Sequence, residues 1–244
     1  MPAPTRISEL GRFRIHHFTE IDSTNRYLLE QARAAASDGL VAVADVQTAG
    51  RGRLERRWEA PPGSSMLVSV LLRSAPDPGQ VVMAAGVALA EAVERVAGVA
   101  AALKWPNDLV VEDRKLAGLL AEREDDALVV GAGCNVNWES FPPELAATAT
   151  ACNLEAGRVV DRDALLLAYL ELFAVLLDDG DATLDAYRAR LATLGRRVLV
   201  EHVGGGSLVG VATAVADDGA LVVRDATGTE HTIIAADVIH LRPR

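Results

Sequence analysis

The segment QTAGRGRLERRW, residues 47–58 and here called the arginine loop, combines four arginines with two glycines. Arginine carries a planar, permanently charged guanidinium group whose N–H donors match phosphate and carboxylate oxygens. Gly50 and Gly52 have no Cβ atom, so the backbone can approach a ligand closely at these positions. The loop is therefore predicted to bind an anion. Repulsion among its cations further predicts that the loop is flexible until a polyanion binds and orders it.

Simpler interpretations of the loop remain open from these residues alone. An arginine-rich run is often a solvated surface. Trp58 has a flat ring that could stack on a nucleobase, but such a ring also packs well in a core or at its rim. The sequence has no G-x-x-x-x-G-K-S/T string, and no G-x-G-x-x-G string leads from an expected strand into a helix. The standard nucleotide-binding loops are therefore excluded as the explanation.

Further polar side chains occur where strands are expected to end, which is where loops gather around a site. They lie in the strings KWPNDL, RKLAG and GAGCNVN and are Lys104, Asn107, Asp108, Lys115, Asn135 and Asn137. Each has an ordinary alternative, because a single lysine is commonly solvated and Asn-Asp after proline is typical of a turn.

The composition limits the class of protein. The 244 residues are 50% hydrophobic and carry 24 Lys and Arg against 34 Asp and Glu, a net charge of -10. This acidic balance argues against general nucleic-acid binding. The chain has neither a membrane-spanning apolar run nor a secretory signal, so we expect a cytoplasmic protein. Cys134 and Cys152 lack the spaced partners of a zinc site and are predicted to be buried and apolar in character.

Hydrophobic periodicity predicts the elements that position these residues. Strands are expected at 12–18, 40–46, 66–72, 119–124 and 128–137, with a hairpin at 110–118, and helices at 24–36, 79–96, 161–178 and 183–194. From Arg196 onward, short strands alternate with glycine turns, which is typical of a small barrel. We therefore expect two domains, 1–195 and 196–244, with a boundary near Gly195.

The strings TAGRGR-x-x-R-x-W, KWPNDL, RKLAG and GAG-x-NVN follow one another in this order, after Ser-Thr-Asn at 23–25 and before the small barrel. In this the chain resembles the biotin protein ligase family over nearly its whole length. The resemblance implies an α+β fold: a catalytic domain similar to class II aminoacyl-tRNA synthetases, with a mixed or antiparallel sheet and flanking helices, and a C-terminal SH3-like β-barrel. It also implies that ATP and Mg²⁺ convert biotin to biotinyl-5′-AMP, and that biotin then passes to a lysine of a biotin carboxyl carrier domain.

The same resemblance implies roles for individual residues. The positions matching the family's biotin-binding residues are Ser23, Thr24, Asn25, Gln47, Arg51, Gly52, Arg53, Lys115 and Gly118. Those matching its ATP- or adenylate-binding residues are Arg51, Arg56, Trp58, Asn107, Lys115 and Asn135. Among these, Lys115 would offset negative charge during adenylate formation, and Arg53 would close over the adenylate. Asp108 matches the carboxylate that orients or deprotonates the acceptor lysine. The metal ligands are not identified.

Each of these roles has a structural alternative. Ser23 could cap a helix and Gly118 could mark a strand bend. Cys134 stands where the family usually has an aliphatic residue, which a small buried thiol can replace.

A lipoate ligase and a nucleic-acid- or effector-binding protein are the two alternative functions. A lipoate ligase shares the fold and the adenylation chemistry, but lipoate would make little use of the Ser-Thr-Asn and Gln47 amide cluster. A nucleic-acid- or effector-binding protein would leave Lys115 and the Asn-Asp pair unexplained. Because the Ser-Thr-Asn segment begins at Ser23, we expect a stand-alone ligase without a DNA-reading domain or repressor activity. A homodimer formed by sheet extension is possible.

Overall fold

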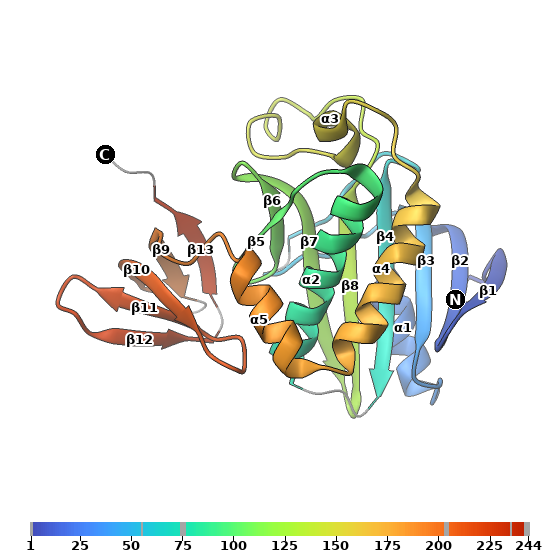
Figure 1. The fold of residues 1–244 in the computed structure, drawn as a ribbon. Coiled ribbons are helices and arrows are strands. Elements are labelled where there is room, and N and C mark those ends of the chain that lie inside the picture. Colours follow the sequence, from blue (N-terminus) through green and yellow to red (C-terminus); the bar gives the residue numbers. More distant parts are fainter. Residues whose placement is uncertain (1, 55, 74–76, 203–204, 235, 242–244) are drawn as a thin grey trace.

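The computed structural model describes residues 2–54, 56–73, 77–202, 205–234 and 236–241. Its larger sheet consists of β1 (Arg6–Leu10), β2 (Phe13–Ile21), β3 (Leu40–Gln47), β4 (Ser65–Arg73), β5 (Ala102–Lys104), β6 (Asp108–Val111), β7 (Arg114–Glu124) and β8 (Ala127–Asn135). The strand order is β1-β2-β3-β4-β8-β7-β6-β5 (Figure 1). Within the described residues, β2 and β3 pair in parallel and every other neighbouring pair is antiparallel. The predicted mixed sheet is confirmed.

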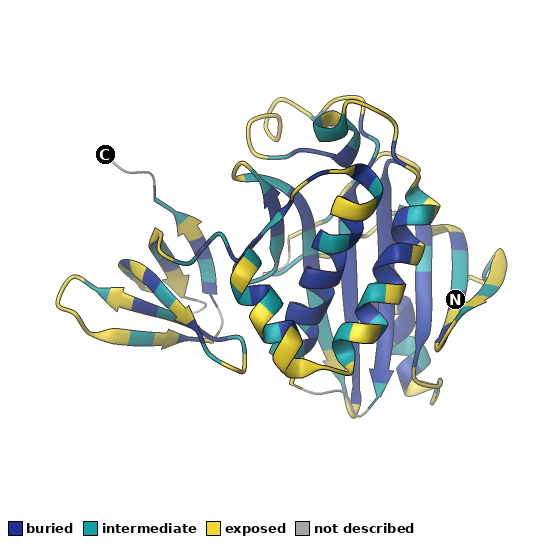
Figure 2. Cartoon of the chain, viewed as in Figure 1, coloured by how far each residue is buried: buried dark blue, intermediate teal, exposed yellow. Residues whose placement is uncertain are grey.

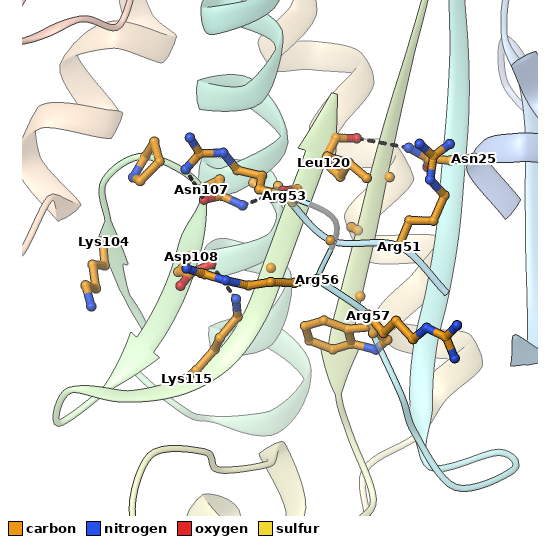
Figure 3. A pocket seen from close by; sticks show the side chains of 18 of the residues that line it. Asn25, Arg51, Arg53, Arg56, Arg57, Lys104, Asn107, Asp108, Lys115 and Leu120 are labelled. Atoms are coloured by element: carbon orange, nitrogen blue, oxygen red, sulfur yellow. Dashed lines mark hydrogen bonds and ion pairs between the residues drawn. The ribbon is translucent and has the colours of Figure 1, made fainter. Parts of the chain in front are cut away.

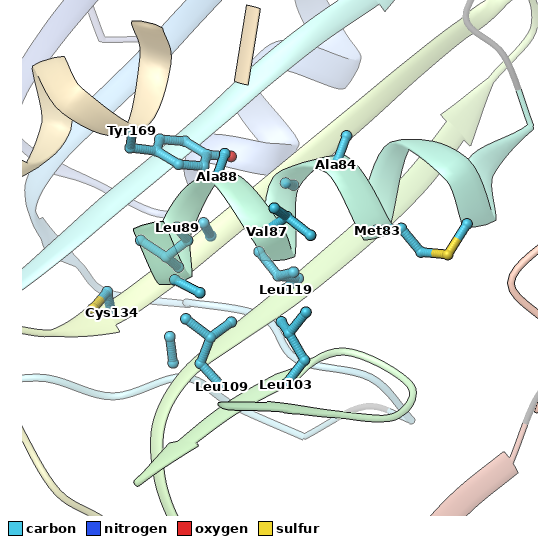
Figure 4. Close-up of a cluster of buried hydrophobic side chains, with 14 of the residues drawn as sticks. Met83, Ala84, Val87, Ala88, Leu89, Leu103, Leu109, Leu119, Cys134 and Tyr169 are labelled. Carbon is cyan, nitrogen blue, oxygen red and sulfur yellow. The ribbon is translucent and has the colours of Figure 1, made fainter. Parts of the chain in front are cut away.

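The two faces of this sheet are covered differently. Helices α2 (Pro78–Ala97), α4 (Arg162–Leu177) and α5 (Gly180–Arg190) lie over one face, and α1 (Thr24–Arg33) packs on part of the other (Figures 1 and 2). The many alanines of α2 let it lie close to the strands, so that Ala84 and Ala88 gather with Leu103, Leu109 and Leu119 in one core (Figure 4). The part of the second face that α1 leaves uncovered remains available for a ligand.

The main differences from the expected elements have local causes. Helix α1 begins at Thr24, and the Ser23 side chain accepts a hydrogen bond from the Arg26 N–H, which confirms the predicted cap. Helix α5 is shifted from the predicted 183–194, because Leu191 adopts an extended conformation and bridges to Leu103 of β5 instead of continuing the helix. The sequence prediction did not include β1, β5 or the short α3 (Cys152–Ala156). It also separated the 119–124 strand from the hairpin before it, whereas the structure has one continuous strand, β7.

The C-terminal region forms a second sheet. Its strands β9 (Arg197–His202), β10 (Ser207–Val215), β11 (Leu221–Asp225), β12 (Glu230–Ile233) and β13 (Ala236–His240) are antiparallel in the order β12-β11-β10-β9-β13. Trp105 Nε1 donates to the Gly219 carbonyl at 2.8 Å and so ties this sheet to the first. The predicted C-terminal β domain is confirmed. The boundary near Gly195 falls between α5 and β9 and stays a prediction.

Both cysteines are free and buried, as predicted. None of the described helices combines the length and the apolar character needed to cross a membrane.

The pKa values of two histidines predict how the free energy of unfolding changes with pH. Burial lowers the pKa of His240, whose ring contacts Asp113 and Thr193, and burial also lowers the pKa of His16, which is hydrogen-bonded to the Tyr27 hydroxyl. The unfolded chain, with histidines at their ordinary value of 6.5, therefore binds protons more readily than the folded chain. We expect the free energy of unfolding to be at its plateau above about pH 6.5 and to fall below it.

Urea titrations at about pH 7.5 and about pH 5.5 would measure this change. The variant His240→Gln should flatten the dependence. A chain that is more stable at the lower pH would contradict the expectation.

Candidate functional site

The uncovered part of the sheet face holds a cavity of about 300 Å³, bounded by α1, the arginine loop, β6 to β8 and the C-terminal sheet (Figure 3). It gathers residues from distant parts of the sequence. The predicted site residues on its wall are Ser23, Thr24, Asn25, Gln47, Arg51, Gly52, Arg53, Arg56, Trp58, Asn107, Asp108, Lys115 and Gly118. The predicted anion site is thus assembled from one loop and several strand ends.

Two of the predicted polar residues, Asn137 and Asn135, do not line this cavity. The Asn137 side chain instead exchanges two hydrogen bonds with the main chain of Val160. Asn135 is the last residue of β8. Its side chain is buried, and Nδ2 donates to the Thr150 carbonyl at 3.0 Å. The segment around Thr150 in turn pairs with β7, because Thr150 N–H donates to the Lys115 carbonyl. In this structure Asn135 fastens the segment that flanks Lys115, and its role toward adenine stays a prediction.

One end of the cavity carries neutral polar groups. Gln47 Oε1 accepts hydrogen bonds from Thr24 N at 2.8 Å and from Thr24 Oγ1 at 3.0 Å. These two bonds fix the oxygen of the Gln47 amide toward α1, which leaves the Nε2 hydrogens to face elsewhere. Neutral amides and hydroxyls of this kind suit a ligand that both donates and accepts hydrogen bonds.

Trp58 lies across two glycines that face each other in neighbouring strands. Gly118 of β7 pairs with Gly133 of β8. A Cβ atom on Gly133 would come within 2.6 Å of the indole, and one on Gly118 within 3.2 Å of the same ring. Gly118 therefore provides clearance for Trp58 and not only a strand bend. The Trp58 ring in turn lies 5.8 Å from Lys115 Nζ, within the range of a cation–π contact.

The described part of the arginine loop folds back on itself. Trp58 N donates to the Gly50 carbonyl at 3.1 Å, and Gly52 N donates to the Arg56 carbonyl at 2.7 Å. A Cβ atom on Gly50 would come within 2.3 Å of the Trp58 carbonyl oxygen, so the close approach predicted for this glycine is made by the chain's own backbone. The predicted closure on a polyanion stays a prediction.

Three carboxylates partner the cations of the cavity. Lys115 Nζ lies 2.7 Å from Asp108 Oδ1, and Arg51 Nη1 lies 2.9 Å from Glu122 Oε1. Arg53 and Arg56 both pair with Asp237 of β13. The surface alternative is therefore wrong for Arg53, whose side chain is mostly buried at the cavity. Arg51 and Arg56 also line the cavity but remain exposed to solvent.

Arg53 connects the two sheets. Its guanidinium donates to the Asn107 side chain at 3.3 Å and to the Ala236 carbonyl at 3.2 Å. Burial lowers the pKa of Arg53, which remains a cation at neutral pH. Because Asn107 lies between β5 and β6 and Ala236 in β13, this one side chain holds the loop, the first sheet and the C-terminal sheet together.

Sequence reasoning did not identify Glu122 and Asp237 as part of the site. Both sit in strands where an acidic residue is read as an ordinary solvent-facing position. The only available signal was indirect: arginines concentrated in an acidic chain require nearby carboxylates to balance them.

The chain is similar to known proteins over both of its sheets. A model of the biotin/lipoate A/B protein ligase family matches residues 18–138, and a model of the biotin protein ligase C-terminal domain matches residues 193–241. The biotin–(acetyl-CoA-carboxylase) ligase of Mycobacterium tuberculosis is 39% identical over 90% of this chain and 86% of its own length. The bifunctional ligase/repressor BirA of Escherichia coli is 32% identical over 83% of this chain and 67% of its own length. The biotin protein ligase from Aquifex aeolicus, solved in complex with biotin and ATP, has a TM-score of 0.84 and 28% identity, covering 93% of this chain and 99% of its own.

Proposed function

The chain belongs to the biotin protein ligase family, and from this membership and the cavity we propose that it is a biotin–(acetyl-CoA-carboxylase) ligase. The resemblance drawn from the four sequence motifs is thereby confirmed. The observation that carries the proposal is the polarity of the cavity. Its Thr24 and Gln47 end is neutral and its Arg53, Arg56 and Lys115 end is cationic, so it matches a ligand with a ureido ring at one end and a phosphate at the other.

The first half-reaction joins two anions. An oxygen of the biotin carboxylate attacks the α-phosphorus of ATP, the bond to the β-phosphate oxygen breaks, and pyrophosphate leaves. Lys115 and the loop arginines would offset the negative charge that gathers at the α-phosphate. Trp58, held on the Gly118 and Gly133 platform, would shield the acyl phosphate from water.

The second half-reaction transfers biotin to an amine. The Nζ atom of the acceptor lysine attacks the acyl carbon, AMP leaves, and the amine loses a proton. Asp108 already has an ammonium group 2.7 Å from its Oδ1 atom, namely that of Lys115. A carboxylate in this place can orient a second, incoming lysine and receive its proton.

Mg²⁺ fits the oxygen donors of the cavity. Asp237 and Glu201 are paired across β13 and β9 and both line the cavity. No group of three or more potential ligating residues occurs in the described parts of the chain. A cavity with few carboxylates suits Mg²⁺, because this ion is commonly held by one or two carboxylates together with substrate phosphates. The ion would supply charge neutralisation at the triphosphate, and Glu201 together with the substrate phosphates would hold it, since Asp237 is already paired with Arg53 and Arg56.

Biotin-dependent exchange of labelled pyrophosphate into ATP tests the first half-reaction. We expect exchange with biotin and none with lipoate in a parallel reaction, because the Thr24 and Gln47 groups have no partner on lipoate's apolar ring. Exchange that depends on lipoate and ignores biotin would favour the lipoate alternative.

Three further expectations complete the proposal: a carboxyl carrier domain as acceptor, a cytoplasmic location and the absence of repressor activity. The acceptor is supported by the name of the Mycobacterium tuberculosis relative. The other two, and a possible homodimer, stay predictions.

A further inference from the structure

Glu122 contacts two residues of the cavity wall without lining the cavity itself. The residue lies in β7, and its side chain is 18% exposed. Its Oε2 atom accepts a hydrogen bond from Asn25 Nδ2 at 2.8 Å, and its Oε1 atom pairs with Arg51 Nη1 at 2.9 Å. Asn25 belongs to α1 and Arg51 to the arginine loop, and the two side chains lie beside each other at one end of the cavity (Figure 3). One carboxylate therefore joins two segments that lie far apart in the sequence.

The hydrogen bonds of Asn25 show that this residue is itself held in place. Its Nδ2 group donates to Glu122 and to the Leu120 carbonyl at 3.2 Å, and its Oδ1 atom accepts from Ser69 Oγ at 2.6 Å. The opposite orientation of the amide would set Oδ1 against two acceptors, so these partners define the orientation. Both Asn25 amide hydrogens are used within the protein.

The strand below Asn25 leaves room for this arrangement. Gly131 of β8 lies opposite Ser69 and Leu120 in the two neighbouring strands. A Cβ atom at Gly131 would come within 2.1 Å of Asn25 Oδ1. The local structure is thus built around one position of the Asn25 side chain, and Glu122 connects that position to Arg51.

We propose that Glu122 is a positioning residue that couples the neutral end of the cavity to the arginine loop, so that Asn25 and Arg51 are placed before biotin binds. This inference rests on the proposed ligase function. An arginine side chain loses considerable rotamer entropy when it is fixed in one place. Glu122 fixes Arg51 in advance, which lowers the cost of ordering it when the ligand arrives.

The direction in which the Kd for biotin changes on substitution of Glu122 distinguishes positioning of Arg51 from electrostatic competition for it. Glutamine has nearly the shape of glutamate but offers one acceptor and one donor, whereas Asn25 and Arg51 both present donors. Glu122→Gln therefore loses one of the two contacts and should weaken biotin binding. If the carboxylate did nothing except compete with anionic ligands for Arg51, its neutralisation would tighten binding instead.

The test compares Glu122→Gln with Glu124→Gln. Glu124 lies two residues along the same strand, has a similar exposure of 25%, and forms an ion pair with Arg33 of α1 at 2.7 Å, away from the cavity. Calorimetric titration with biotin gives Kd, pyrophosphate exchange gives kcat and KM, and thermal melting reports folding. We expect Glu122→Gln to raise the Kd for biotin about tenfold or more, on the scale of one hydrogen bond to a charged group.

The other readouts separate positioning from damage to the fold. At saturating biotin, kcat should change by less than about threefold, as for a lost ground-state contact. Glu124→Gln should bind biotin like the unsubstituted chain while losing comparable thermal stability. Unchanged or tighter biotin binding by Glu122→Gln would overturn the proposal, and so would equal weakening in both variants.

A double substitution tests the coupling itself. In an Arg51→Ala background Glu122 faces Asn25 alone, which a glutamine can satisfy, so Glu122→Gln should then weaken biotin binding by less than about threefold. If Glu122→Gln raised the Kd for biotin by the same factor with and without Arg51, Glu122 would not act through Arg51. If the unsubstituted chain neither binds biotin nor shows biotin-dependent exchange, the ligase function itself fails, an outcome distinct from unchanged binding by the variant.

Discussion

Replacing Lys115 with alanine should slow formation of biotinyl-AMP by about 100-fold or more, the scale of losing one donor to a developing charge. Lys115 is the cation that Asp108 holds at 2.7 Å beside the Trp58 ring, and both contacts fix the position of Nζ. Single-turnover measurement of biotinyl-AMP with excess enzyme would give the rate of this step apart from product release.

The variant Asp108→Asn is the matched control for Lys115→Ala. It removes the charge of the carboxylate but keeps the lysine, its contact with the Trp58 ring and an amide oxygen as a hydrogen-bond acceptor, so adenylate formation should be affected far less than transfer to the acceptor. A near-normal rate of adenylate formation by Lys115→Ala would remove Lys115 from the chemistry of the first half-reaction.

Replacing Arg53 with glycine should release biotinyl-AMP into solution, where it labels lysines of bystander proteins. The guanidinium of Arg53 holds the loop to Asn107 and to the Ala236 carbonyl. Glycine removes both contacts and adds backbone flexibility to the loop. A loop without this tie should open more often, and the mixed anhydride would then escape before transfer. Mass spectrometry of an added bystander protein would measure the labelling.

The variant Asp237→Asn provides the comparison for Arg53→Gly. It removes the carboxylate that pairs with Arg53 and Arg56 but leaves the other hydrogen bonds of Arg53 in place, so it should leak less than Arg53→Gly. Bystander labelling by Arg53→Gly at the level of the unsubstituted chain would contradict the assigned role of the loop.

Local signals in the sequence were sufficient for much of the fold. Helix α1 begins where Ser23 can cap it, and α4 begins where Asp161 accepts hydrogen bonds from Asp163 and Ala164. The end of α5 could not be predicted in this way, because Leu191 leaves the helix to pair with Leu103 of β5. Such a contact depends on tertiary packing, which periodicity along the chain does not record.

In the candidate site, too, the local sequence predicted some features, and others depend on tertiary packing. Nearly every site residue that the motifs predicted lies on the cavity wall, since each motif lies near one end of a strand at the same part of the sheet. They did not separate residues that face the cavity from residues that support it. Asn135 turned out to bind the Thr150 carbonyl, and Glu122 was not identified although it contacts Asn25 and Arg51. Distinguishing these cases requires knowing which partners each polar atom already has.

The most direct test of the ligase function uses a purified biotin carboxyl carrier domain, incubated with the protein, biotin and MgATP and analysed by mass spectrometry. We expect a mass increase of one biotinyl group on a single lysine of the carrier, absent when ATP is omitted and absent when lipoate replaces biotin. An unmodified carrier, together with no release of AMP, would contradict the proposal that the cavity forms and transfers a biotinyl adenylate.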